Sequence, residues 1–202
     1  EGQILSDGKP VNVMEEYLPL QETLRAGILC NNAELELTQQ GYSIKGDPTE
    51  GALVVSAAKA GIKADLKRID EIPFSSELMY MATLHRVGDS TVVYIKGSPE
   101  KILEMCQDQL FCNVVGALNK EEALQAANNM ARDALRIMGM AYRRFDGAKT
   151  SLKNGDLSGM TFLGLQGMID PPRQEAIEAV KACRKAGIRV VMITGDHVET
   201  AR

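Results

Sequence analysis

The sequence predicts an α+β domain over residues 1–155, with an antiparallel sheet and flanking helices, followed by part of an α/β domain over residues 156–202. Short strand-like runs, tight turns and amphipathic helices indicate the first part. The second part is indicated by its order of strand, helix and strand, with polar residues after each strand. Its strands are expected over Phe162–Ile169 and Ile188–Ile193, parallel to each other in an open, Rossmann-like sheet.

The first elements are predicted from turn and cap signals. Residues 4–13 predict a hairpin around Asp7–Gly8, and apolar residues at helical spacing predict a helix that ends near Asn31. A short strand is expected over Tyr42–Lys45. The sequence Asp47-Pro-Thr-Glu50 then begins a second helix, with Asp47 as its N-cap. This helix is expected to end at Gly61 and to direct four apolar residues inward: Leu53, Val54, Ala57 and Ala58.

The middle of the chain predicts a run of strands and helices. Strands are expected over 67–73, 79–86 and 91–96, with Gly88–Asp89 as a hairpin turn between the last two. Ser98 begins a helix that ends near Cys106, and residues 119–133 form another. A strand over 135–144 and a polar loop over 147–158 complete the first part.

The second part has a strong helix-start signal at Asp170, because Asp can cap the helix and the following Pro can begin it. The helix is expected over about 172–186, with Gly187 after it and an apolar face of Ile177, Val180 and Cys183. The last strand would lack a neighbour on one side, so we expect this end of the chain to be disordered or to pair between molecules.

The composition is that of an ordinary globular protein. The net charge of −4 and the lack of a basic run argue against nucleic acid as a partner. No apolar stretch is long enough to span a bilayer, and the polar start is not a signal peptide and looks like a cut. The histidines and cysteines show no metal-binding spacing and predict no metal site: His85, His197, Cys30, Cys106, Cys112 and Cys183.

Six segments, in family order, resemble the P-type cation-transporting ATPases, including the calcium and sodium/potassium pumps and their bacterial counterparts. Four resemble the nucleotide-binding domain, namely Lys45–Leu53, Ile72–Ser76, Tyr94–Glu100 and Ala134–Tyr142. The other two, Asp170–Arg173 and Thr194–Asp196, resemble the phosphorylation domain, which has a haloacid dehalogenase-like fold. The resemblance covers nearly the whole chain and implies ATP as a ligand.

The resemblance implies roles for several residues of the first part. Phe74 would stack on adenine, a contact worth about 1–3 kcal/mol, whereas the residue pattern alone favours a core Phe at a strand end. Glu50 would accept a hydrogen bond from the adenine amino group, or else complete the capping box of its own helix. Lys96 and Gly97 would line the pocket near a helix N-terminus, which suits phosphates.

Arg136 would reach the phosphates, although strand alternation alone makes it a solvated residue. In the second part, Thr194 and Gly195 would lie beside the transferred phosphoryl group and Asp196 near the ribose, or Asp196 would cap a helix. Asp170 and Arg173 are expected to have a structural or hinge role.

The chain departs from the family pattern in two ways. Met79 stands where the family often has a Lys, which removes a positive charge from the expected ATP site. The phosphorylated Asp of the Asp-Lys-Thr-Gly-Thr loop and the later Mg²⁺ ligands do not occur in the sequence, so no catalytic residue is predicted.

The resemblance therefore implies a cytoplasmic ATP-binding fragment of an integral plasma-membrane pump. The intact protein would couple ATP hydrolysis to cation transport through an aspartyl-phosphate, with Mg²⁺ ligands outside this chain. Its partners would be the phosphorylation, actuator and membrane domains of the same polypeptide. Two alternatives stay open: the cap and partial core of a soluble haloacid dehalogenase-like phosphatase, or a non-catalytic nucleotide-sensing module.

Overall fold

A computed structural model of the chain describes residues 4–13, 17–39, 41–63, 65–169 and 174–191. Its main sheet has seven strands in the order β5-β6-β7-β10-β11-β8-β9. Neighbouring strands are antiparallel, except for the parallel pair β11 and β8. The strands are β5 Arg68–Ile72, β6 Tyr80–Val87, β7 Ser90–Gly97, β8 Cys106–Phe111, β9 Val114–Ala117, β10 Arg136–Phe145 and β11 Met160–Met168.

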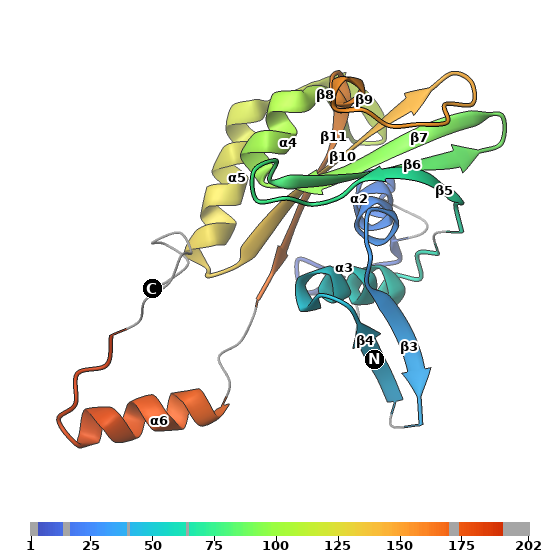
Figure 1. The fold of residues 1–202 in the computed structure, drawn as a ribbon. Coiled ribbons are helices and arrows are strands. Elements are labelled where there is room, and N and C mark those ends of the chain that lie inside the picture. The colour runs from blue at the N-terminus through green and yellow to red at the C-terminus, as the bar shows by residue number, and fades with distance from the viewer. Residues whose placement is uncertain (1–3, 14–16, 40, 64, 170–173, 192–202) are drawn as a thin grey trace.

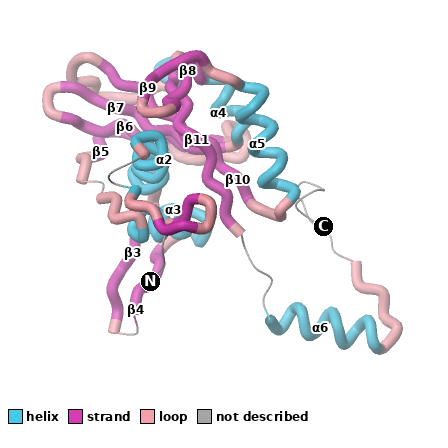
Figure 2. The backbone as a smooth tube through the Cα atoms, turned by 180° about the vertical axis from the view of Figure 1, so that it is seen from behind, coloured by secondary structure: helices cyan, strands magenta, loops and turns pink. Residues whose placement is uncertain are grey.

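Helices lie on both faces of this sheet (Figures 1 and 2). On one face are α4 (Pro99–Met105) and α5 (Lys120–Arg132), and on the other are α2 (Leu18–Leu29) and α3 (Pro48–Lys59). Along β7, Val93 and Ile95 pack in the core that includes α4, whereas Val92 and Tyr94 pack in the core that includes α2 and α3. Strand β7, in the interior of the sheet, is thus buried on both faces, which explains its continuous apolar run.

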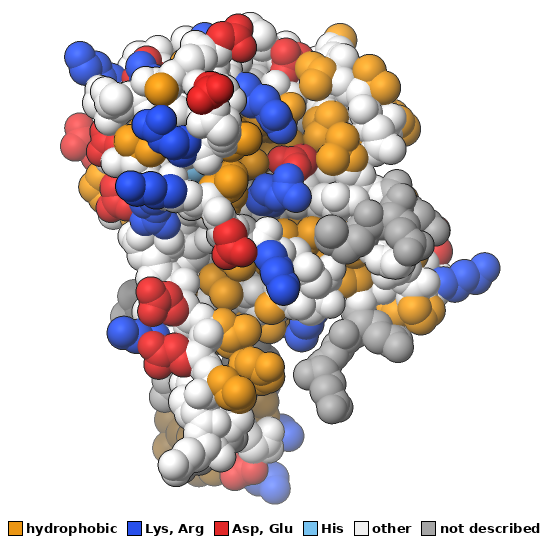
Figure 3. Space-filling model, turned by 90° about the vertical axis from the view of Figure 1, so that its right-hand side faces the viewer, with side chains coloured by type: hydrophobic (Ala, Val, Ile, Leu, Met, Phe, Trp, Pro, Cys, Tyr) orange, Lys and Arg blue, Asp and Glu red, His pale blue; other side chains and the backbone are white. Residues whose placement is uncertain are grey.

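Two small hairpins accompany the main sheet. The first pairs β1 (Leu5–Ser6) with β2 (Lys9–Pro10), as the turn at Asp7–Gly8 predicted. The second pairs β3 (Glu34–Thr38) with β4 (Gly41–Lys45) and extends away from the main sheet (Figure 1). Only the β4 half of it was predicted. Figure 3, which views the molecule from this side, shows acidic and basic side chains interspersed over the surface.

Most predicted elements of the first part are confirmed, and the cap residues explain why. Three side chains accept hydrogen bonds from the first backbone N–H groups of helices: Asp47 at α3, Ser98 at α4 and Asn119 at α5. The prediction that Ala58 faces inward was wrong, because Ala58 is exposed whereas its neighbour Ala57 is fully buried. Strands β8 and β9 were not predicted, since β8 begins directly after α4 without a turn signal.

Strand β11 does not begin a separate parallel unit. It pairs antiparallel with β10 along most of its length and parallel with β8, so it belongs to the main sheet. Its parallel partner is therefore not the predicted strand at 188–193, of which residues 188–191 are described and form no strand. The cause is burial, because Phe162 and Leu163 each enter one of the two cores beside β10. The sheet contains residues on both sides of the predicted boundary at 155 and 156.

The predicted helix of the second part is present as α6 (Gln174–Lys185). None of its residues is buried, and the predicted apolar face of Ile177, Val180 and Cys183 is only half-buried. Five candidate residues lie outside the described residues: Asp170, Arg173, Thr194, Gly195 and Asp196. Among the helices that the structure describes, none has both the length and the apolar character needed to cross a bilayer.

Candidate functional site

An open cavity of about 610 Å³ lies at one end of the main sheet. Strands β5 and β7 end there, and β6 and β10 begin there, because these neighbours are antiparallel. The start of α3 closes the cavity on another side. Its walls include all five residues of the first part that the resemblance assigned to ATP: Glu50, Phe74, Lys96, Gly97 and Arg136. The fold thus brings together residues from four separate segments.

Phe74 lies in the connection between β5 and β6, and the residue is 60% exposed. It is therefore not the core residue that the sequence pattern alone favoured. Pro73 before it and Met79 after it also line the cavity. An exposed ring at the wall of an open cavity can stack on a planar ligand, since every nucleobase offers a flat face.

Glu50 and Lys96 form a largely buried ion pair in the cavity. The Lys96 Nζ lies 2.6 Å from the Glu50 Oε1, and the two side chains are only 5% and 17% exposed. The other oxygen of Glu50 accepts a hydrogen bond from the backbone N–H of Asn32, at 3.1 Å. Among the described hydrogen bonds the Glu50 carboxylate accepts from Lys96 and Asn32 and not from the backbone N–H of Asp47, so the capping-box alternative is not formed here.

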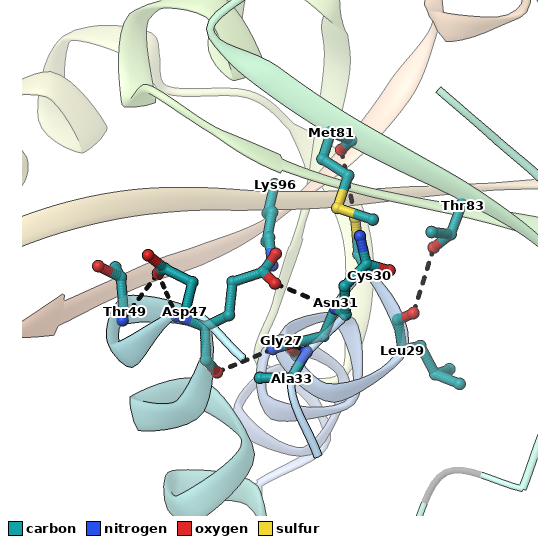
Figure 4. Close-up of polar contacts among 12 residues, drawn as sticks. Gly27, Leu29, Cys30, Asn31, Ala33, Asp47, Thr49, Met81, Thr83 and Lys96 are labelled. Atoms are coloured by element: carbon teal, nitrogen blue, oxygen red, sulfur yellow. Dashed lines mark hydrogen bonds and ion pairs between the residues drawn. The ribbon is translucent and has the colours of Figure 1, made fainter. Parts of the chain in front are cut away.

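Lys96 extends from β7 toward the start of α3, where Asp47 and Thr49 lie (Figure 4). In the ligand-free cavity the charge of its ammonium group is matched by the Glu50 carboxylate. The backbone N–H of Glu50, together with that of Thr49 and the charge of Arg136, lowers the pKa of Asp47 below its ordinary value.

Gly97 has a packing role that the sequence did not reveal. A Cβ at this position would lie 2.4 Å from the backbone oxygen of Met79 and 2.7 Å from the Cβ of Tyr80. The glycine therefore allows β6 to begin close against the end of β7. The close approach that requires glycine is made by the protein's own backbone.

Arg136 is the first residue of β10 and is exposed, as strand alternation predicted. Its Nη1 donates a hydrogen bond to the Thr49 hydroxyl, at 3.3 Å. The contact places a guanidinium at the rim formed by β10 and the start of α3, where a planar group with several donors suits an anionic ligand.

Sequence reasoning missed much of the cavity wall. Asp47 and Thr49 lie within a quoted motif, so the motif itself could have suggested them. Asn32 carried no signal, because it follows α2 in a segment without a recognised pattern. The remaining wall residues are apolar or small and sit where strands meet the cavity: Met81, Ser98, Ile137 and Met138.

The fold and the cavity define a class of protein, an α+β domain that carries an open ligand-sized cavity at the ends of four sheet strands. The family model described as "P-type ATPase, cytoplasmic domain N" matches residues 19–175. The chain belongs to the P-type ATPase family, which confirms the resemblance that the motifs suggested.

Curated relatives agree with this assignment. The chain is 44% identical over 200 residues to a cation-transporting ATPase, pma1, of Synechocystis, a match that covers 95% of the chain and 22% of that protein. It is 36% identical over 212 residues to a calcium-transporting ATPase of Bacillus subtilis, covering 100% of the chain and 24% of the relative. A probable cation-transporting ATPase F of Mycobacterium bovis is 39% identical over 203 residues, covering 97% and 22%. The chain thus spans less than a quarter of the length of these relatives.

Proposed function

We propose that this chain is the ATP-binding part of a cation-transporting P-type ATPase. The observation that carries the proposal is the meeting of Phe74, Glu50, Lys96, Gly97 and Arg136 around one open cavity. The names of the relatives, which include cation-transporting and calcium-transporting ATPases, support transport of a cation by the intact protein. The family model describes a cytoplasmic domain, which supports a cytoplasmic location for this part of a membrane protein.

In the proposed binding mode, adenine stacks on Phe74 and the phosphates extend toward Arg136. The Glu50 carboxylate has about four acceptor positions and uses one for Lys96 and one for Asn32, so it can still accept from an adenine amino group. Lys96 then acts mainly by neutralising Glu50. Without that ammonium, the unpaired negative charge of Glu50 would lie in the same cavity as the phosphates and oppose their binding.

The proposed contribution to catalysis is delivery of ATP. Phosphoryl transfer depends mainly on positioning and charge neutralisation, so a domain that orients ATP toward an acceptor Asp makes physical sense. The acceptor and the Mg²⁺ ligands are not part of this sequence, and the chain alone is proposed to hydrolyse no ATP. Thr194, Gly195 and Asp196 are proposed to contact the nucleotide and its phosphoryl group from the phosphorylation domain. Asp170 and Arg173 are proposed to have a structural or hinge role.

Calorimetry and NMR titration with ATP test the binding proposal. Wild-type chain should bind ATP, with the ring signals of Phe74 shifted, and Phe74→Ala should weaken binding about tenfold, the size expected for loss of one stacking contact. Phe111→Ala is the matched control, because Phe111 is 67% exposed on β8 and does not line the cavity. Its affinity should equal that of the wild type.

Two results would contradict the proposal. If ATP leaves the Phe74 signals unchanged, the domain is better explained as an interaction module for another partner. If the purified chain turns ATP over steadily, the assignment of delivery without catalysis is wrong.

A further inference from the structure

We infer that Arg68 is a positioning residue for the cavity, which acts through Asn32 on the Glu50–Lys96 ion pair. The inference rests on the proposed function, because it takes the cavity as the ATP site. Arg68 lies on β5 and does not line the cavity itself. No motif in the sequence singles it out.

The guanidinium of Arg68 fixes the segment that follows α2. Its Nη2 donates to the backbone oxygen of Leu29, at 3.1 Å, and to that of Asn31. These carbonyls lie at the C-terminal end of the helix, where backbone oxygens have no partner within the helix. Its Nη1 donates to the Asn32 Oδ1 and to Glu71 Oε2, both at 2.7 Å. A planar fork with several donors can serve these acceptors together, which an ammonium group cannot do in the same geometry.

The two asparagines after α2 hold Glu50 by both its main chain and its side chain. The Asn31 amide is buried and donates to the backbone oxygens of Gly27 and Glu50, each at 2.9 Å. The next residue, Asn32, donates its backbone N–H to the Glu50 carboxylate. Figure 4 shows Asn31 between the end of α2 and the start of α3. A shift of residues 31 and 32 would therefore move the carboxylate.

Strand β6 holds the same turn of α2 from another side. The Cys30 thiol donates to the backbone oxygen of Met81, at 3.2 Å, and the Thr83 hydroxyl donates to that of Leu29, at 3.4 Å. These contacts anchor the end of the helix but not Asn32. Among the side-chain contacts described for Asn32, the bond to Arg68 fixes its amide, and since a guanidinium only donates, the amide oxygen must face Arg68.

The contacts form one connected path from outside the cavity to its centre: Arg68, Asn32, Glu50 and Lys96. Removal of Arg68 leaves the Glu50 carboxylate intact but frees the backbone that orients it. Sites held about 1 Å too loosely lose function although every contacting group is present. Loss of Arg68 should therefore weaken ATP binding without removing any group that touches ATP.

A double-mutant cycle in the full 202-residue chain tests this inference, with ATP affinity measured by calorimetry. Arg68→Gln should bind ATP about three- to tenfold more weakly than wild type, the range that corresponds to one net hydrogen bond. In a Glu50→Ala background, Arg68→Gln should have little further effect, because no carboxylate remains to be oriented. Arg86→Gln is the control, an exposed arginine on the neighbouring strand β6 that lies outside the cavity wall.

A structural readout accompanies the affinities. In the ligand-free Arg68→Gln variant, the backbone amide signal of Asn32 should shift, since its hydrogen bond to Glu50 is altered, while the Tyr94 core signals stay in place. If Arg68→Gln does not fold, Arg68→Lys takes its place in the cycle, because it keeps the charge and loses the fork.

The outcomes separate the two proposals. Wild-type affinity in the folded Arg68 variants, or losses that simply add in the cycle, would overturn the inference and leave the proposed function standing. If wild type binds no ATP, the proposed function fails and the inference fails with it.

Discussion

Breaking the Glu50–Lys96 pair is the sharpest test of how the cavity is held together. Glu50→Ala would leave the Lys96 ammonium, whose side chain is only 5% exposed, without its carboxylate partner at 2.6 Å. Of the nearby wall residues, Met79 and Met81 have no carboxylate, and the Asp47 carboxylate already accepts hydrogen bonds from the backbone N–H groups of Thr49 and Glu50. The variant therefore keeps the buried positive charge of Lys96 and removes the carboxylate that neutralises it.

The expected cost follows from the geometry. Removing one partner of a buried ion pair typically destabilises a protein by about 3–5 kcal/mol. Glu50 is 17% exposed and the cavity is open, so water can partly solvate Lys96, and we expect the low end, about 3 kcal/mol. For a chain of this length that corresponds to a fall in Tm of about 6–12 °C. Lys96→Met should cost about 1 kcal/mol, because the methionine fills the stem and Glu50 keeps the Asn32 N–H.

Urea denaturation followed by circular dichroism measures these free energies of unfolding. The double variant Glu50→Ala with Lys96→Met should be about 2 kcal/mol more stable than Glu50→Ala alone, since no charge is left unpaired. Glu36→Ala is the control, because its ion pair with Lys45 is exposed and should matter by less than about 0.5 kcal/mol. The reasoning would be refuted if the losses in free energy of unfolding of the two single variants simply added in the double variant. It would also be refuted if Glu50→Ala were no less stable than Lys96→Met.

Three further predictions concern charge, backbone packing and pH. Met79→Lys adds a cation to the cavity wall, so ATP affinity should rise about two- to fivefold at low salt, and unchanged affinity in calorimetry would count against a phosphate tail near this residue. Gly97→Ala should lower the free energy of unfolding by about 2 kcal/mol or more, because its Cβ would collide with the Met79 backbone, whereas Gly116→Ala, with nothing within 4 Å, should be neutral in the same urea titration. Burial lowers the pKa of His85 below its ordinary 6.5, so the unfolded chain takes up the proton first and stability should fall as the pH drops below about 6.5. His85→Gln should flatten that fall, and equal slopes for the two proteins between pH 7 and pH 5 would show that another group is responsible.

Local signals explain why much of the fold was predictable. A cap residue acts on N–H groups two or three positions away, so Asp47 and Ser98 marked helix starts that the structure shows at the expected places. The hairpin turn at Gly88–Asp89 is local in the same sense. Strand β8 had no such signal, because what makes it a strand is its pairing with β11, more than fifty residues later in the chain.

The placement of β11 shows the same limit at the level of domains. The apolar run of β11 predicted a strand correctly. The spacing of apolar residues, however, does not indicate which other strand it will pair with. The run joined the main sheet beside β10, where both of its faces are buried, and not a parallel partner in the second part. Which strands pair depends on how their side chains pack in the cores on the two faces of the sheet.

The cavity could be predicted only through the family resemblance. Residue types alone favoured a buried Phe74, which the structure contradicts, and left the binding role of Glu50 and its capping role as equal alternatives. The partner of Glu50 is 46 positions away, and Arg68 reaches residues 36 to 39 positions away. No local pattern contains such contacts.

The segments that wall the cavity are far apart in sequence yet adjacent in space. Any occupant would act as a noncovalent cross-link between them, so that none could open while the molecule stays bound. Amide hydrogen exchange should then slow across β5, β6, β7 and β10 together, rather than at one loop. A small molecule at the sheet end would in this way determine how rigid the whole domain is.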